Sequence, residues 1–203
     1  MKSGRWSILA RGVGLAMLIL SGVDCQADRG VPSPPAAAPT TAPSSAPTAK
    51  DVQTFEDRRA GVRFNYPSGW APEKAATAVF DVAAPASATK GYASISLDVP
   101  SVPPHFPGMI TPKIICDHYV KDLRENQIHD AKVEEAVDIK AAGAPARRVK
   151  CSGHEKGKVM IEVAVVIVHS ERIYIFSCDA DPEGYAAARA ALDQAVATLE
   201  WIK

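Results

Sequence analysis

The chain has 203 residues and equal numbers of basic and acidic side chains, so its formal net charge is zero. A balanced charge argues against nucleic-acid binding over a broad basic surface and against charge-driven attachment to a membrane. About 150 residues remain once the N-terminal segments described next are set aside, which is the size of one ordinary domain with its own core.

The first residues have the pattern of a secretory signal peptide. Three basic residues precede an apolar run over residues 12–23, and small side chains follow at Cys25 and Ala27. This pattern predicts cleavage between Ala27 and Asp28. The apolar run is too short to span a bilayer, which takes about 20 residues, and no later stretch is long enough. We therefore expect an exported chain, periplasmic or secreted, in which 20 basic and 22 acidic residues remain.

A second interpretation makes Cys25 the lipidated first residue of a lipoprotein. Lipidation requires small residues before the cysteine, and residues 22–24 (GVD) fit poorly because Asp24 is acidic and adjoins the cut. The sequence favours free secretion, with membrane attachment only through a lipidated Cys25.

Residues 28–50 form a tract of Pro, Ala, Ser and Thr that includes VPSPPAAAPTTAPSSAPTAK. Such a segment has too few large apolar groups to offset chain entropy, so we expect a disordered, extended spacer. It serves as a stalk if the chain is lipid-anchored and as a plain spacer if it is not. The globular domain is expected over residues 51–203.

The first half of that domain predicts strands followed by a helix. Strand-like alternation covers residues 62–66, 77–82 and 92–99, and a turn (PSG) follows the first of these. The segment from 100 to 108 holds four prolines and is expected to be a loop. Thr111 and Pro112 are suited to the N-cap and first position of a helix that ends near Asn126.

The second half predicts more strands and a closing helix. Strands are expected over residues 132–140, 146–152, 157–169 and 172–178. The third of these is apolar on both faces, which is typical of a central strand covered on both sides. Asp181-Pro182 is expected to cap the last helix. Its apolar stripe is Tyr185, Ala188, Leu192, Val196 and Leu199.

Two segments carry a resemblance to a known family. Residues 61–70 (GVRFNYPSGW) resemble the opening hairpin of the Mog1/PsbP-like superfamily. Residues 173–178 (IYIFSC), 181–185 (DPEGY) and a terminal helix ending at Trp201 resemble its closing strand and helix. The resemblance covers about residues 52–203 and implies an α+β fold, an antiparallel sheet flanked by helices on both faces.

The same resemblance implies a non-enzymatic role. The superfamily contains accessory and partner-binding proteins of photosystem assembly, small-GTPase regulation and bacterial envelopes. Its motifs in this chain are structural, so no binding residue is carried over.

No catalytic signature occurs in the chain. It has no G-x-S-x-G elbow, no Walker loop, no G-x-G-x-x-G and no C-x-x-C. Glu134, Glu135 and Asp138 are paired carboxylates on what reads as an exposed strand, and a solvated face is the favoured interpretation. We therefore assign no catalytic residue and no cofactor, and we do not expect an enzyme.

The histidines and cysteines give no metal site. Residues 116–118 (CDH) form the tightest cluster, but residues two apart on a helix point in different directions. His154 and His169 lie in predicted hairpin turns, and the short ligand spacings typical of zinc sites are absent. No metal is expected.

Signal cleavage leaves Cys116, Cys151 and Cys178. A two-residue turn at 170–171 and a four-residue loop at 154–157 would place Cys178 opposite Val163 and Cys151 opposite Met160, on opposite faces. Strands with one strand between them lie about 10 Å apart, beyond the reach of a disulfide. A disulfide would therefore join Cys116 to Cys151 or Cys178. The alternative is three buried thiols, and both remain open.

Trp70, His105 and Phe106 are the candidates for a binding surface. Trp70 follows a turn, and the other two lie inside the proline-rich loop, where a stiff exposed segment can act in recognition. The alternatives are that Trp70 closes the core and that Phe106 covers the sheet edge.

The sequence thus favours an exported, non-enzymatic accessory, binding or scaffold domain of the cell envelope. Its partner would be an unknown protein or envelope component. The alternatives are a hydrolase whose site is assembled from scattered residues, and a structural envelope protein.

Overall fold

The computed structural model describes residues 52–73, 78–101 and 110–203. The elements in chain order are β1 (Val52–Asp57), β2 (Val62–Pro67), β3 (Ala71–Pro72), β4 (Phe80–Ala83), β5 (Ala93–Asp98), α1 (Pro112–Asn126), β6 (Lys132–Ala141), β7 (Ala144–Glu155), β8 (Lys158–His169), β9 (Arg172–Ala180), α2 (Tyr185–Ala197) and β10 (Glu200–Trp201). The predicted signal peptide with Cys25, Ala27 and Asp28, the predicted spacer, and the loop residues His105 and Phe106 lie outside the described residues.

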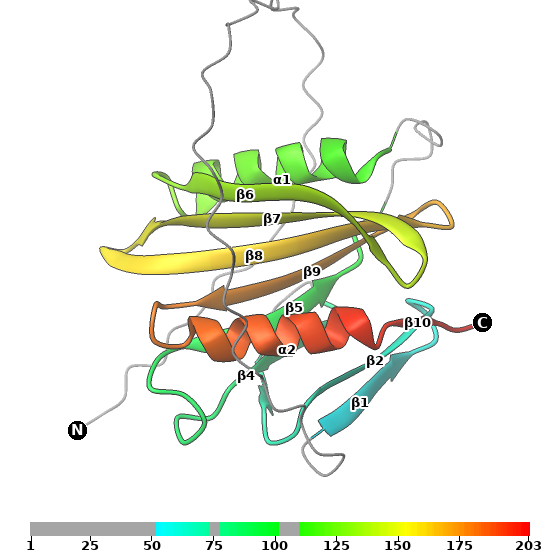
Figure 1. Ribbon diagram of the computed structural model, residues 1–203, viewed down its shortest axis with the longest axis horizontal. Coiled ribbons are helices and arrows are strands. Elements are labelled where there is room, and N and C mark those ends of the chain that lie inside the picture. Colours follow the sequence, from blue (N-terminus) through cyan, green and yellow to red (C-terminus); the bar gives the residue numbers. More distant parts are fainter. Residues whose placement is uncertain (1–51, 74–77, 102–109) are drawn as a thin grey trace, which may run out of the picture.

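The strands form two antiparallel sheets. The larger has seven strands in the order β3-β4-β5-β9-β8-β7-β6, and the smaller has the order β1-β2-β10 (Figure 1). The resemblance led us to expect a helix up to Trp201, and this is wrong. The last helix ends at Ala197, and Glu200–Trp201 turns into a short strand that pairs with β2.

Trp201 joins the smaller sheet to the hairpin ends of the larger one. Its indole N–H donates to the carbonyl oxygen of Ala142 at 3.0 Å, and its ring stacks on His169 with centroids 4.0 Å apart. The short terminal strand therefore fixes the position of the smaller sheet.

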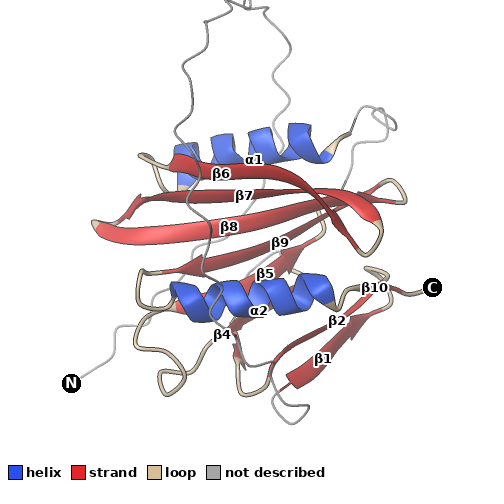
Figure 2. Ribbon diagram, viewed as in Figure 1, coloured by secondary structure: helices blue, strands red, loops and turns tan. Residues whose placement is uncertain are grey.

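Strand β8 lies at the centre of the core. Val163, Val165 and Ile167 belong to an apolar cluster that includes the buried residues of α2. Ala164 and Val166 belong to a second cluster that includes those of α1. Side chains alternate along a strand, so alternating residues of β8 belong to the cluster of one helix and to the cluster of the other; Figure 2 shows the two helices beside the larger sheet.

The first helix begins as the sequence predicts, and the second does not. The Thr111 hydroxyl accepts a hydrogen bond from the Ile114 N–H, and Pro112 is the first helical residue. The last helix begins at Tyr185 rather than directly after Asp181. The Asp181 carboxylate instead accepts hydrogen bonds from the backbone N–H groups of Tyr92 (2.9 Å) and Gly184 (2.8 Å). This side chain ties the start of α2 to β5.

Three hairpins of the larger sheet share one turn geometry. The turns are Ala142-Gly143, Lys156-Gly157 and Ser170-Glu171, each with positive φ at both positions. Two-residue turns of this kind match the twist of the strands that they join. The Ser170-Glu171 turn confirms the two-residue turn predicted at 170–171. The four-residue loop predicted over 154–157 is wrong, because β7 and β8 pair as far as Glu155 and Lys158.

The β7–β8 turn has two residues rather than the four predicted, so the strand partner of Cys151 lies two residues from the predicted one. Cys178 lies opposite Val163, as predicted, whereas Cys151 lies opposite Glu162 rather than Met160. A shift of two residues preserves the face of the sheet. Cys151 and Cys178 therefore still belong to different clusters, the first with the buried residues of α1 and the second with those of α2.

Within the described residues, no helix combines the length and the apolar character needed to cross a membrane.

Candidate functional site

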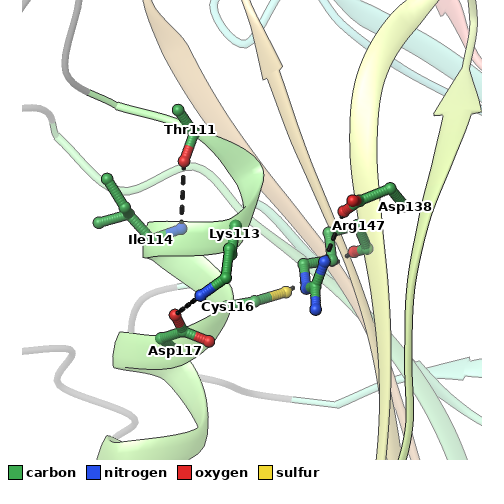
Figure 3. A network of polar contacts seen from close by, with 7 residues as sticks. All are labelled: Thr111, Lys113, Ile114, Cys116, Asp117, Asp138 and Arg147. Atoms are coloured by element: carbon green, nitrogen blue, oxygen red, sulfur yellow. Dashed lines mark hydrogen bonds and ion pairs between the residues drawn. The ribbon is translucent and has the colours of Figure 1, made fainter. Parts of the chain in front are cut away.

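The three cysteines of the globular domain are buried free thiols. Figure 3 shows Cys116 on α1 pointing toward β7, where its thiol donates to the Arg147 carbonyl oxygen at 3.7 Å. Burial raises the pKa of Cys116 to about 12, and it also raises the pKa of Cys151 and Cys178. Thiols held protonated in this way are weak nucleophiles and poor metal ligands.

Trp70 belongs to the core rather than to an exposed surface. Only 7% of the residue is exposed, and it lies in the cluster beneath α2. Of the two interpretations of Trp70, the structure therefore supports closure of the core.

One histidine forms a pair with a carboxylate. His154 Nδ1 lies 2.7 Å from Asp130 Oδ2, and the backbone N–H of His154 donates to Oδ1 at 2.6 Å. The side-chain hydrogen bond from His154 is the main cause of the lowered pKa of Asp130. Both side chains are exposed. No group of three metal-binding side chains occurs in the part of the chain that the structure describes.

The structure reveals a buried polar cluster that was not predicted. Glu162 on β8 and Asp179 on β9 lie directly opposite each other, only 3% and 7% exposed. The Tyr119 hydroxyl of α1 donates to the Glu162 carboxylate. On the other side of Asp179, Ser94 is its cross-strand partner on β5.

Hydroxyl groups extend this cluster toward the edge of the sheet. The Tyr92 hydroxyl lies 3.1 Å from both Ser94 Oγ and Glu73 Oε2, and Ser96 Oγ lies 2.9 Å from Ser177 Oγ. Burial, and then the charge of Asp179, raise the pKa of Tyr92, so this hydroxyl stays protonated.

A signal for the cluster was present in the sequence. The face of β5 opposite to its apolar side reads Ser94, Ser96 and Asp98, and β9 places Ser177 and Asp179 on the same side. Hydroxyl and carboxyl groups at alternate positions of a central strand indicate a buried polar network.

The larger sheet is covered unevenly on its α2 side. Helix α2 packs against β9 and β5, while β6, β7 and β8 carry no helix on that side among the described elements (Figure 1). We call this uncovered area the open face. It consists of Glu134, Glu135, Val137, Arg148, Lys150 and Val159.

The charges of the open face are paired and partly buried. Lys150 Nζ lies 2.6 Å from Glu134, and Arg148 contacts Glu135 at 2.5 Å. The hydrogen bond between Glu134 and Lys150 lowers the pKa of the carboxyl and raises the pKa of the amine. Lys150 also lies 5.0 Å from the centre of the Tyr185 ring on α2. The carboxylates are thus on an exposed strand, as predicted, but each is held by a basic residue of β7.

Two large apolar side chains are exposed beside these ion pairs. Val137 is 38% exposed and Val159 is 42% exposed. Taken as a whole, protein interfaces combine polar and apolar area in this way, so the open face is the candidate surface for a protein partner.

The sequence matches no protein-family model and no curated protein. Solved structures with a similar fold include cyanobacterial PsbP (CyanoP) from Synechocystis sp. PCC 6803 (TM-score 0.53, 15% identity, 79% of this chain and 98% of that one). The Ran-binding protein Mog1p of Saccharomyces cerevisiae gives a TM-score of 0.53 at 11% identity, over 75% and 96% of the two chains. LpqN of Mycobacterium tuberculosis, involved in cell envelope biogenesis, gives 0.51 at 13%, over 70% and 83%. At these identities the likeness concerns the fold alone.

Proposed function

We propose, from the Mog1/PsbP-like fold that this chain has, that the protein is an exported, non-enzymatic accessory domain that binds a partner protein of the cell envelope. One of the similar structures is a Ran-binding protein and another is involved in cell envelope biogenesis. The open face carries the proposal, because it offers ordered charges and exposed valines on a rigid sheet.

The N-terminal residues support the proposed location outside the cytoplasm. The predicted signal peptide, with cleavage between Ala27 and Asp28, would deliver the domain outside the cytoplasm, and the spacer over 28–50 would then precede it. Intact-mass measurement of protein purified from its native cells tests this step. A mass for residues 28–203 supports free secretion, and a mass that begins at an acylated Cys25 supports a lipid anchor.

The division of the core into two apolar clusters supports a more specific fold, with a helix on each face of the larger sheet. Because the buried residues of α1 and of α2 belong to two clusters that take up alternating residues of β8, we infer that the helices lie on opposite faces of the larger sheet, as in an α/β/α sandwich. The open face is then the part of one side that α2 leaves uncovered.

Site-specific photo-cross-linking tests the binding role. A photoreactive residue at Val159 should give an adduct whose mass differs from twice that of the chain, when the mature protein is exposed to its native envelope. Ile114, which is equally exposed on α1, is the matched control position. The adduct at Val159 should be lost when Lys150→Glu is added, because Glu134 would then face a like charge. Equal labelling at both positions would contradict the assignment of the open face.

A further inference from the structure

We propose that the spacer folds back onto the domain and that its Ala46-Pro47 dipeptide occupies an aromatic cleft between the smaller sheet and β4. Three observations support this contact: the side chains that line the cleft, the composition of the spacer and the point where the spacer joins β1. The contact does not depend on the function proposed above.

The aromatic cleft lies where the smaller sheet meets the β3–β4 edge of the larger one (Figure 1). Its volume is about 310 Å³, and its lining includes Phe55, Tyr66, Pro72, Phe80 and Val82. The centre of the Phe80 ring lies 4.8 Å from that of Phe55 and 4.9 Å from that of Tyr66. Phe55 and Tyr66 are only half-buried, so part of this aromatic surface is accessible. A cleft of this size and lining is suited to a small apolar group.

Two carboxylates border the cleft, but neither makes it a site for a cation. Phe80 and Val82 belong to the apolar cluster that includes the buried residues of α2, so Asp81 between them directs its side chain to the other face of β4. The Glu73 carboxylate accepts a hydrogen bond from the Tyr92 hydroxyl at 3.1 Å, in the polar cluster described above. The cleft therefore favours an uncharged occupant.

The spacer has the composition that such a cleft can bind. Residues 30–49 carry no charge and include six prolines, three of which follow an alanine. Proline-rich segments favour the polyproline-II helix, and grooves lined by aromatic side chains are common binding sites for this helix. An Ala-Pro dipeptide from such a segment is compact, apolar and uncharged, and so matches the cleft.

The attachment of the spacer places it at the cleft. The chain enters β1 at Val52, and the next residue, Gln53, is the strand partner of Tyr66. Pro47 precedes Val52 by five residues, which span about 15 Å in a polyproline-II helix and so allow the dipeptide to reach back to the aromatic rings. A short tether gives an effective concentration of about millimolar, so a contact with a millimolar Kd is already well populated.

Loop closure distinguishes the three Ala-Pro dipeptides of the spacer. Those at 38–39 and 42–43 lie farther from β1 than the one at 46–47. A longer loop loses more entropy when its ends are brought together. The dipeptide nearest to β1 is therefore the favoured occupant.

Proton NMR of the chain from residue 28 to 203 tests the contact directly. The ring protons of Pro47 should move upfield relative to those of Pro39, because a group that lies over an aromatic face is shielded. They should also show NOEs to the Tyr66 ring. Pro39 follows an alanine in the same spacer and is the matched internal control. The shifts should not change with protein concentration, since the contact is intramolecular.

Two variants outside the described domain separate docking from folding. Pro47→Glu would bring a charge into an apolar cleft, so it should displace the segment and shift the amide signals of Tyr66 and Phe80. Pro39→Glu should leave both signals unchanged.

Three results would overturn the proposal. The first is equal proton shifts at Pro47 and Pro39 without NOEs to Tyr66, which would show an unoccupied cleft. The second is an equal effect of the two variants on the amide signals. The third is a shift that depends on concentration, which would assign the cleft to the spacer of a second copy.

Discussion

The turn between β8 and β9 holds backbone strain that can be relieved by one substitution. Ser170 and Glu171 have φ values of 48° and 62°, the left-handed region that disfavours residues with a Cβ atom. The two equivalent turns have glycine at the second position, Gly143 and Gly157, both with φ of 79°. We therefore expect Glu171→Gly to stabilise the protein.

The magnitude follows from two opposing contributions. A non-glycine residue in the left-handed region costs about 1–2 kcal/mol. Glycine loses about 0.5–1 kcal/mol more conformational entropy on folding than alanine does. The net gain for Glu171→Gly is therefore about 0.5–1 kcal/mol, which corresponds to roughly 1–4 °C in Tm for a domain of this size.

Urea unfolding of the wild type, of Glu171→Gly and Glu171→Ala, and of the reciprocal variant Gly157→Ala measures this strain. Glu171→Ala keeps a Cβ atom and should give no comparable gain, while Gly157→Ala should lose about 1 kcal/mol at a turn of the same geometry. The reasoning would be refuted if Glu171→Gly were neutral or destabilising while Gly157→Ala carried its expected cost. The strain at the β8–β9 turn would then be absent.

Three further results are expected. The pKa of Asp130 is lowered, so its pairing with His154 stabilises the fold above pH 3.8, the ordinary pKa of this carboxyl, and does so less as the pH falls below it. The difference in unfolding free energy between wild type and Asp130→Asn should therefore narrow when unfolding is measured in acid. Tyr119→Phe removes the hydroxyl that donates to buried Glu162 and should cost about 1–3 kcal/mol in urea unfolding, and no change would show that water replaces it. The three thiols, buried and with raised pKa values, should react with a thiol reagent only after denaturation, and rapid reaction in the native state would contradict their burial.

The sequence alone determined the elements whose causes lie within a few residues. Thr111 and Pro112 predicted the start of α1, because a side-chain acceptor and a ring without an N–H act on the adjacent turn. Alternation predicted a strand over residues 92–99, and the structure has β5 there, with Ala93, Ile95 and Leu97 in one buried cluster. The short turn at 170–171 was likewise a local property.

Tertiary structure decided everything that depends on register and on where a helix crosses the sheet. The polar residues were visible in the sequence, but the meeting of Glu162 with Asp179 depends on strand pairing across a turn. The strand at Glu200–Trp201 pairs with β2, and two residues are too few to specify a strand without that neighbour. The open face is exposed because α2 packs over β9 and β5 and not over β6–β8. Local patterns specify which side of an element is apolar, whereas the partner that covers it is chosen by the packing of the whole domain.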